Sequence, residues 1–420
     1  MELDPMTDYV TTDATRNADL KQLRETLMSQ RVRAVDYVAS AGALRSDLTD
    51  LVLSGTESEI SEDGVTPTAG RYSLTRGAEN GLASMLDIPT KYMGRMRSTL
   101  PTLYDDNVNG WLDNDPSRKF LLRLLRSEAG DGLSDGVVRA VLSNSYKPID
   151  NLDVLLAALD GIRKAGVKVA IDGCDLTDNR MYVRVAAPEV MALAPTLLKG
   201  YRNPFGGGGA VRANGARDTA GLLGAFGPGS GPHAGYEAGE QPVVFGGFVL
   251  SNSETGNGAF SITPRLIVKI CKNGLTIPVD AFRRTHLGAK LEEGVVKVSA
   301  ETQQRNLALV RSQTSDVVST FLDTSYVEKK IAELERDAGV EVKDSKGTLE
   351  QVAKVEMYSQ SEADDILNFF IDGGQRTAGG VAAAVTAYAQ TIEDGDRAAE
   401  LEATAVHAMA FVAKGRPLVH

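Results

Sequence analysis

Val141-Leu142-Ser143-Asn144-Ser145 is a five-residue string that occurs a second time at residues 249–253. Each copy ends a β-like run at a polar turn. After the first copy come Tyr146 to Asn151 and an apolar helical pattern that Gly166 closes, which predicts a strand, a turn and a capped helix. After the second come turn residues 254–258 and a β-branched run, which predict a hairpin. A true internal repeat and a chance duplication are both compatible with this pair.

The composition is that of a globular protein with two or three domains, since the chain has 420 residues and 42% hydrophobic content. Cys174 and Cys271 lie far apart in strand-like segments, so we interpret them as reduced core residues. The sequence contains no apolar run of membrane-spanning length and no signal-peptide pattern, so we expect a soluble cytoplasmic protein. Residues 1–5, ahead of Met6, are compatible with a vector remnant.

The distribution of charge matters more than the net charge of −11. Residues 1–129 contain 15 basic residues (Lys and Arg) and 20 acidic residues (Asp and Glu). The corresponding counts are 18 and 16 in residues 130–300, and 12 and 20 in residues 301–420. Residues 1–129 and 301–420 therefore carry a net negative charge, and the β-rich middle of the chain is slightly basic.

The order of patterns predicts an α+β fold, with an antiparallel sheet core, packed helices, an N-terminal helical subdomain and a C-terminal helical region. Residues 1–70 are expected to form an arm with one helix, and residues 71–129 a helical subdomain. Residues 130–300 form the predicted α+β core. Its glycine-rich insertion, residues 200–239, has 13 glycines in 40 positions and is typical of a flexible segment. Residues 301–420 are predicted to be helical, with a long helix over residues 301–338 and breaks at Gly373-Gly374 and Gly379-Gly380.

Two strand candidates place basic residues on one face and apolar residues on the other, because side chains alternate along a strand. In residues 180–185 the basic face carries Arg180, Tyr182 and Arg184, and in residues 265–271 it carries Arg265 and Lys269. Such a cationic platform with a stacking ring suits single-stranded nucleic acid. A strand face that simply carries charges to water is the alternative. The full set of predicted nucleic-acid-binding residues is Arg139, Lys147, Arg180, Tyr182, Arg184, Arg265, Lys269, Lys272, Arg283 and Arg284, with Tyr146 as a second stacking surface.

Other motifs are weaker. Residues 82–95 have the rhythm of a helix-turn-helix, with Lys91, Arg95 and Arg97 on or near the second helix and Asp87 where a turn glycine is more usual. Glu341 and Lys343 after Asp337 give a faint nuclease-like pattern within a charge run. The sequence has no phosphate-binding loop, no HExxH or GxSxG motif and no histidine pair at metal spacing, so we expect neither an enzyme nor a cofactor or metal site.

Several motifs together resemble the phage/plasmid-like protein family, a domain-of-unknown-function group of bacteriophages, prophages and conjugative elements. They are Leu74 to Ala78, Leu86 to Tyr92, Val138 to Asn151, Ser251 to Gly256 and Cys271 to Leu275, and Ala384 to Tyr388 is similar to the family's C-terminal signature. The glycine-rich insertion departs from the family pattern. The order of elements in residues 137–275 is also similar to that of single-strand annealing proteins, at the level of fold alone.

The resemblance and the basic strand faces lead to one functional hypothesis. We expect a phage-type protein of the bacterial host cytoplasm that binds single-stranded DNA without sequence readout. It would act as a homo-oligomer in annealing, recombination or replication. The alternative is a non-enzymatic phage assembly or interaction protein that forms a homo-oligomer.

Overall fold

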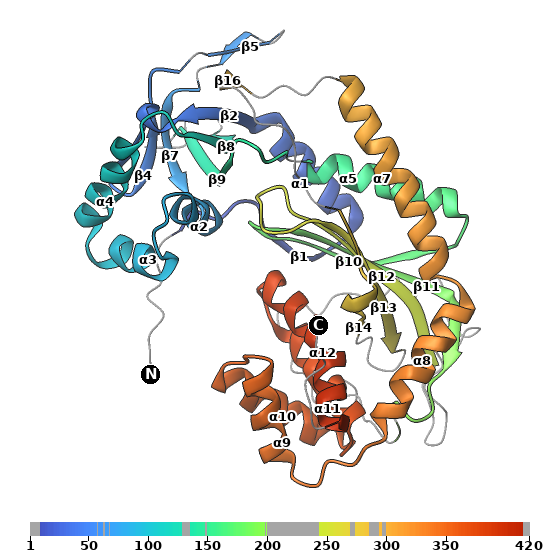
Figure 1. The fold of residues 1–420 in the computed structure, drawn as a ribbon. Helices are drawn as coiled ribbons and strands as arrows, with labels where there is room; N and C mark the ends of the chain where they lie inside the picture. The colour runs from blue at the N-terminus through green and yellow to red at the C-terminus, as the bar shows by residue number, and fades with distance from the viewer. Residues whose placement is uncertain are drawn as a thin grey trace.

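The fold is α+β and consists of two lobes, each built on its own sheet (Figure 1). The computed structural model describes residues 9–56, 58–61, 64–66, 68–127, 135–147, 149–197, 199, 243–268, 274–284, 294–295 and 300–414. The insertion 200–239, Cys271, Lys269, Lys272 and residues 1–5 lie outside the described residues. Within the described part, no helix is both long and apolar enough to cross a bilayer.

The N-terminal lobe contains a mixed sheet in the order β16-β2-β8-β9-β7-β4-β3, in which only the pair β7–β9 is parallel among the described strands. Its strands are β2 (Ala34–Ser40), β3 (Leu44–Asp47), β4 (Asp50–Leu53), β7 (Gly70–Leu74), β8 (Lys119–Arg126), β9 (Gly136–Ser143) and β16 (Gly294–Val295). The short 3₁₀ turn η1 (Ala41–Ala43) joins β2 to β3, and β5 (Glu59–Ser61) pairs with β6 (Gly64–Thr66) in a separate hairpin.

The predicted N-terminal arm is wrong, because residues 34–53 form three strands of this sheet. Side chains alternate between buried and exposed along β3, and Leu51 and Leu53 of β4 are buried. This is the pattern of a half-buried strand, but β3 and β4 have only four residues each, and the turns beside them made the segment look like a loop.

Three helices belong to this lobe, namely α2 (Arg76–Met85), α3 (Thr90–Thr99) and α4 (Pro101–Asn114). Helices α2 and α4 pack on the sheet, and α3 packs on α2 and α4. They confirm the helical patterns of residues 75–112. The helical subdomain does not continue to residue 129, however, because residues 119–126 form strand β8. That strand pairs on both sides and is buried from Phe120 to Leu125, so its apolar run lacks the alternation that would mark a strand.

The C-terminal lobe contains an antiparallel sheet in the order β1-β10-β11-β12-β13-β14, with β15 also pairing with β13. Its strands are β1 (Thr15–Ala18), β10 (Ala170–Leu176), β11 (Met181–Leu193), β12 (Val243–Asn252), β13 (Phe260–Val268), β14 (Gly274–Thr276) and β15 (Phe282–Arg284). The first copy of the five-residue string ends β9 ahead of helix α5 (Asn151–Ala165), and the second ends β12 ahead of β13. Both predictions are therefore confirmed, including Gly166 at φ 74 after α5.

Helices cover both faces of this second sheet (Figure 1). They are α1 (Leu20–Arg33), α5, α7 (Ala300–Phe321), α8 (Thr324–Ala338), α9 (Ser345–Val355), α10 (Gln360–Gly373), α11 (Ala378–Thr391) and α12 (Gly395–Lys414), and a 3₁₀ turn, η2 (Pro278–Asp280), follows β14. The predicted single helix over residues 301–338 is divided in two, because the Asp323 side chain caps α8. Gly374 ends α10 as predicted, whereas Gly379 and Gly380 lie in the first turn of α11.

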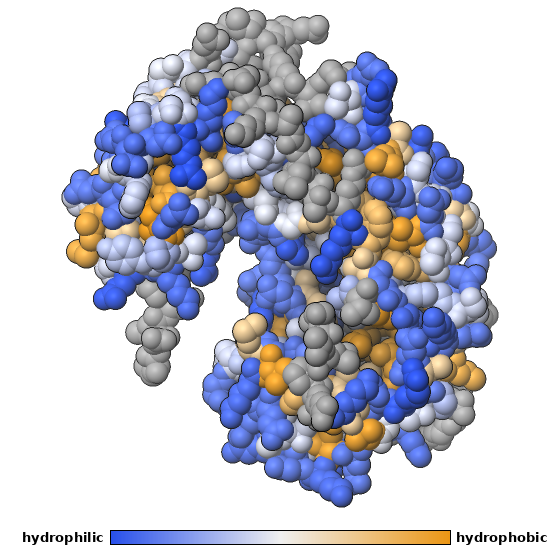
Figure 2. Space-filling model, in the orientation of Figure 1, coloured by the Kyte–Doolittle hydropathy of each residue, from blue (hydrophilic) through white to orange (hydrophobic). Residues whose placement is uncertain are grey.

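An open notch separates the N-terminal lobe from the end of the C-terminal lobe that carries α9 to α12 (Figure 2). The surface around this notch is largely hydrophilic. At its inner end the two lobes meet through loops, and these loops contain three of the six family-like motifs described above.

Candidate nucleic-acid interface

The predicted cationic platform on β11 is not open to solvent. β11 is buried on both faces from Met181 to Pro188. The Arg184 side chain donates to Asp175 Oδ1 at 2.9 Å and to Asn17 Oδ1 at 2.6 Å. Burial works to raise the pKa of Asp175, but the neighbouring Arg184 and Arg16 outweigh it and hold that pKa below its ordinary value. Arg184 therefore belongs to a buried charge cluster with Arg16 and Asp175.

Arg265 and Tyr182 on the same sheet are also covered. Arg265 is 3% exposed and lies 3.1 Å from Asp172 and 3.2 Å from Glu402 of α12. The Tyr182 hydroxyl donates to Asp396 Oδ1 at 2.9 Å, and burial raises its pKa. The expected exposure of Arg184, Arg265 and Tyr182 is thus wrong. Helix α12 contributes Glu402 and Asp396 to this face, and the neighbouring strand β10 contributes Asp172 and Asp175.

The other predicted residues are divided between the interior and the surface. Arg139 is 5% exposed and pairs with Glu254. Lys147 and Arg180 are half-buried, and Arg283 is exposed on β15. The backbone of Arg284 pairs with Phe260.

Four chain segments far apart in sequence meet where the lobes join. We name this place the motif junction, and define it as residues 75–78, 143–151 without residue 148, 177–180 and 252–258. Three of these segments contain motifs of the family resemblance, and two contain the ends of the repeated string. The structure therefore brings together residues that the sequence separates by up to about 180 positions.

Glu254 lies at the centre of the motif junction and is 6% exposed. One carboxylate oxygen accepts from Arg139, and the other accepts from the backbone N–H of Asn151 at 3.0 Å. Helix α5 follows the first copy of the string and Glu254 follows the second, so the Glu254 carboxylate caps the N-terminus of α5. The carboxylate also meets the positive end of the α5 dipole there. The Asn252 amide adds a bond of 2.9 Å to Asn151 Oδ1.

Arg123 of β8 is a central residue that the sequence analysis missed. Its guanidinium donates to Asp36 at 2.8 Å, to Asp150 at 2.6 Å and to the Glu254 carbonyl oxygen at 2.8 Å. Burial acts to lower the pKa of Arg123, but these carboxylates raise it well above the ordinary value. The available signal was a single arginine inside the apolar run 120–125, since a buried strand tolerates a charge only when it is paired.

The first turn of α2 fits closely against the hairpin loops of the second lobe. Thr75 caps α2 by accepting from Ala78 N at 3.1 Å and donates to the Arg139 carbonyl oxygen at 3.1 Å. A Cβ at Gly77 would lie 2.7 Å from Asn179 Oδ1, so a larger residue there would force the Asn179 side chain to shift. Asn179 also accepts from the Asn257 amide at 2.9 Å.

The N-terminus of α12 completes the motif junction from the opposite side. One oxygen of Asp396 accepts from Thr177 Oγ1 and from Asn179 Nδ2, each at 2.9 Å. The other accepts from Tyr182, as described above. The loop 177–180 is therefore bonded to α12 on one side and lies close to the first turn of α2 on the other.

Basic and aromatic groups remain at the rim of the motif junction. Arg76 is exposed at the start of α2, Lys147 is half-buried, and Arg180 donates to the Asn257 carbonyl oxygen at 2.7 Å through its Nε. Tyr146 is half-buried, donates to the Ser253 carbonyl oxygen at 3.2 Å, and has its pKa raised to about 12 by burial. It stays a neutral phenol at physiological pH.

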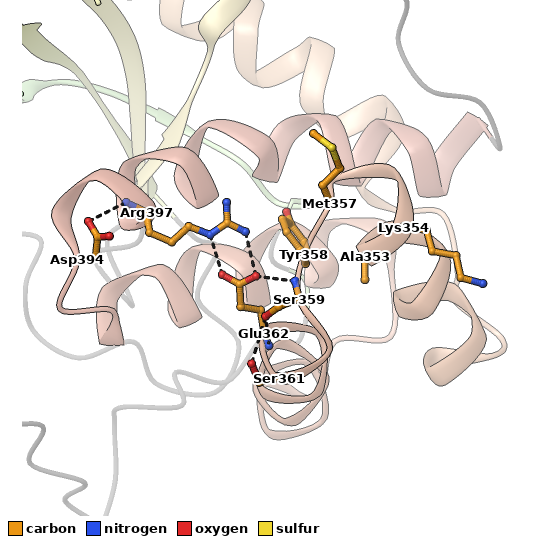
Figure 3. Close-up of a pocket in the computed structure, with 9 residues that line it drawn as sticks. All are labelled: Ala353, Lys354, Met357, Tyr358, Ser359, Ser361, Glu362, Asp394 and Arg397. Atoms are coloured by element: carbon orange, nitrogen blue, oxygen red, sulfur yellow. Dashed lines mark hydrogen bonds and ion pairs between the residues drawn. The ribbon is translucent and has the colours of Figure 1, made fainter. Parts of the chain in front are cut away.

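A pocket of about 710 Å³ lies elsewhere, between α9, α10 and α12 (Figure 3). Its polar wall is an ion pair in which Arg397 donates to both carboxylate oxygens of Glu362, at 2.7 and 2.9 Å. The hydrogen bonds from Arg397 keep the pKa of Glu362 below its ordinary value. Both charges are thus used within the protein, and the pocket offers no unpaired acid–base couple among its lining residues.

Comparisons of the chain with family models, with curated proteins and with solved structures each gave no match. The family resemblance described above therefore stays an expectation from the sequence motifs.

Proposed function

We propose that this chain is a phage-type protein that binds single-stranded DNA without sequence readout at the rim of the motif junction. The binding would support annealing, recombination or replication in the cytoplasm of a bacterial host, with the chain acting as a homo-oligomer. No catalytic group is required for this activity.

One observation carries the proposal, namely that Arg76 at the start of α2 lies in the same junction as Lys147 and Arg180, which are on two loops. Phosphate groups are bound by such cations without reading sequence, and an aromatic side chain such as Tyr146 offers a stacking surface. The buried cluster below, with Arg123, Arg139 and Glu254, would hold these loops in place before DNA arrives, so little ordering entropy is lost on binding.

The test is binding of a fluorescent single-stranded oligonucleotide at about 50 and about 200 mM salt, where phosphate contacts give a steep loss of affinity. We expect the wild-type protein to bind at low salt and Arg76→Ala/Lys147→Ala to bind roughly tenfold more weakly, with a shallower salt dependence. The matched control is Lys329→Ala/Arg336→Ala, two exposed cations of α8.

Unchanged binding in the control, together with weakened binding in the junction variant, would support the proposed site. If the wild-type protein shows no affinity at the lower salt concentration, the proposal is wrong, and a non-enzymatic assembly role becomes the better account. If both double variants weaken binding equally, the affinity belongs to general surface charge and the junction site is wrong.

A further inference from the structure

A tight turn joins α2 to α3, so this segment has the order of a helix-turn-helix unit. Asp87 takes a left-handed conformation with φ 58, which Asp tolerates better than most residues other than glycine. The next residue, Ile88, donates its N–H to the Ala83 carbonyl oxygen at 2.8 Å, which closes the turn. The side chains that hold the two helices together are buried at helical spacing, namely Leu82, Ala83, Leu86, Ile88, Met93 and Met96.

The outward face of α3 is polar, basic and exposed. Lys91, Arg95 and Thr99 follow one another at four-residue intervals and are all exposed, so they form one row along the helix. Tyr92, 47% exposed, lies beside this row. The helix has no acidic residue.

Arg97 of the same helix serves a different purpose. It turns inward, lies 3.2 Å from Glu79 and packs its guanidinium over the rings of Tyr9 and Tyr104. Glu79 is 1% exposed, so this pair anchors α3 on α2 and is not available to a ligand. The outward row is thus supported by a rigid base.

The pair α9–α10 provides an internal comparison, because it repeats the turn with the opposite charge. Met357 takes φ 55, and Tyr358 donates its N–H to the Ala353 carbonyl oxygen at 2.8 Å, as Ile88 does to Ala83. Helix α10, however, has four acidic residues and no basic one, and Asp364, Asp365 and Asp372 are exposed. The carboxylates of that face would repel DNA phosphates. Both units share the same turn, and the charge of the second helix distinguishes them.

We propose that α3 enters the major groove of double-stranded DNA, with Lys91 and Arg95 reaching phosphates or guanine edges and Tyr92 packing beside them. Helix α3 lies on the outside of the N-terminal lobe, beside the notch, where its outward face meets solvent (Figure 1). This inference goes beyond single-strand binding at the motif junction, because it concerns a different form of DNA and different residues.

The experiment compares the full chain and two double variants for binding to a fluorescent DNA duplex and to a single strand of the same sequence. Lys91→Ala/Arg95→Ala removes the basic row of α3. Lys346→Ala/Lys354→Ala removes two exposed cations of α9, in the acidic unit, and is the matched control. Because all four side chains are exposed, the thermal midpoints should stay equal, which circular dichroism checks.

We expect the α3 variant to lose about tenfold or more in duplex affinity and up to about two units of salt slope, with single-strand affinity unchanged. The control should match the wild-type protein. Absence of duplex binding by the wild-type protein, equal binding by the α3 variant, or equal loss in the control would each overturn the inference. Loss of duplex and single-strand binding together would also overturn it, and would move the single-strand site to α3.

Discussion

Arg184 and Arg265 show that the burial of an arginine, rather than its place in a strand pattern, decides its role. Each faces carboxylates from other elements, Asp175 for Arg184 and Glu402 for Arg265. Removing one partner of such a cluster leaves the other charge buried with fewer partners, which costs more than the pair contributes.

We predict that Arg184→Ala lowers the free energy of unfolding by about 3 kcal/mol, because the buried Asp175 then loses one of its two arginine partners and keeps Arg16. The double variant Arg184→Ala/Asp175→Asn should lose less than the sum of the two single changes. Urea unfolding followed by circular dichroism measures all four proteins. Strict additivity would show that the two side chains do not act as a pair.

The stability contributed by Asp175 should depend on pH with a definite sign. Its pKa is lowered in the folded protein from an ordinary value of 3.8, so the contribution is complete above about pH 4 and is lost as the pH falls toward the depressed value. The difference in urea midpoint between the wild-type protein and Asp175→Asn should therefore be constant from pH 7 to about pH 5 and shrink below about pH 4. A difference that grows on acidification would contradict the assigned ion pair.

At the scale of elements, close approach between a helix and a strand positions the motif junction. Helix α2 lies on β9 so tightly that a Cβ at Gly81 would be 2.4 Å from the Val141 carbonyl oxygen, which is backbone and cannot turn away. Gly110 of α4 is also a helical glycine, but a Cβ there would meet none of the described atoms within 4 Å.

The same substitution should therefore have opposite effects at these two glycines. Gly81→Ala should cost about 1 to 3 kcal/mol, because α2 must move away from β9. Gly110→Ala should stabilise by about 0.4 to 1 kcal/mol through helix propensity and the less flexible unfolded chain. Thermal and urea midpoints of both variants decide this, and a neutral Gly81→Ala would mean that the helix is not held against the strand.

At the scale of the whole molecule, the motif junction couples two lobes that have separate hydrophobic cores. Glu254 joins the two lobes, through Arg139 of β9 in one lobe and the backbone N–H of Asn151 at the start of α5 in the other. The single tryptophan, Trp111 on α4, reports on the N-terminal lobe, whereas most helices lie in the other lobe.

We predict that Glu254→Ala separates the unfolding of the two lobes. In the wild-type protein, Trp111 fluorescence and the circular dichroism of the helices should change at one urea concentration, and in the variant at two. Glu400→Ala, which removes an exposed carboxylate of α12, should leave the transitions together. Coincident transitions in Glu254→Ala would show that other contacts couple the lobes.

Local features of the fold could be predicted from the sequence because short-range physics sets them. The two copies of the repeated string were each read correctly as a strand end, since a polar turn follows each. The capped helix α5 was also predicted, because its apolar spacing and Gly166 are local signals. The tight turn at Asp87 was predicted for the same reason.

Longer-range features could not be predicted. The strands of residues 34–53 and the strand β8 were missed, since short runs and fully buried runs lack a clear period. Arg123 gave only the signal of a charge in an apolar run.

The sequence by itself determined the α+β class, the order of most elements and the motifs that meet in the junction, because these follow from neighbours within a few residues. Only the tertiary structure decided which cations face solvent. Arg265 meets Glu402 across 137 positions of the chain, and Arg139 meets Glu254 across 115. A charged side chain is exposed or neutralised according to what packs against it, and such distant partners are set by the packing of whole elements.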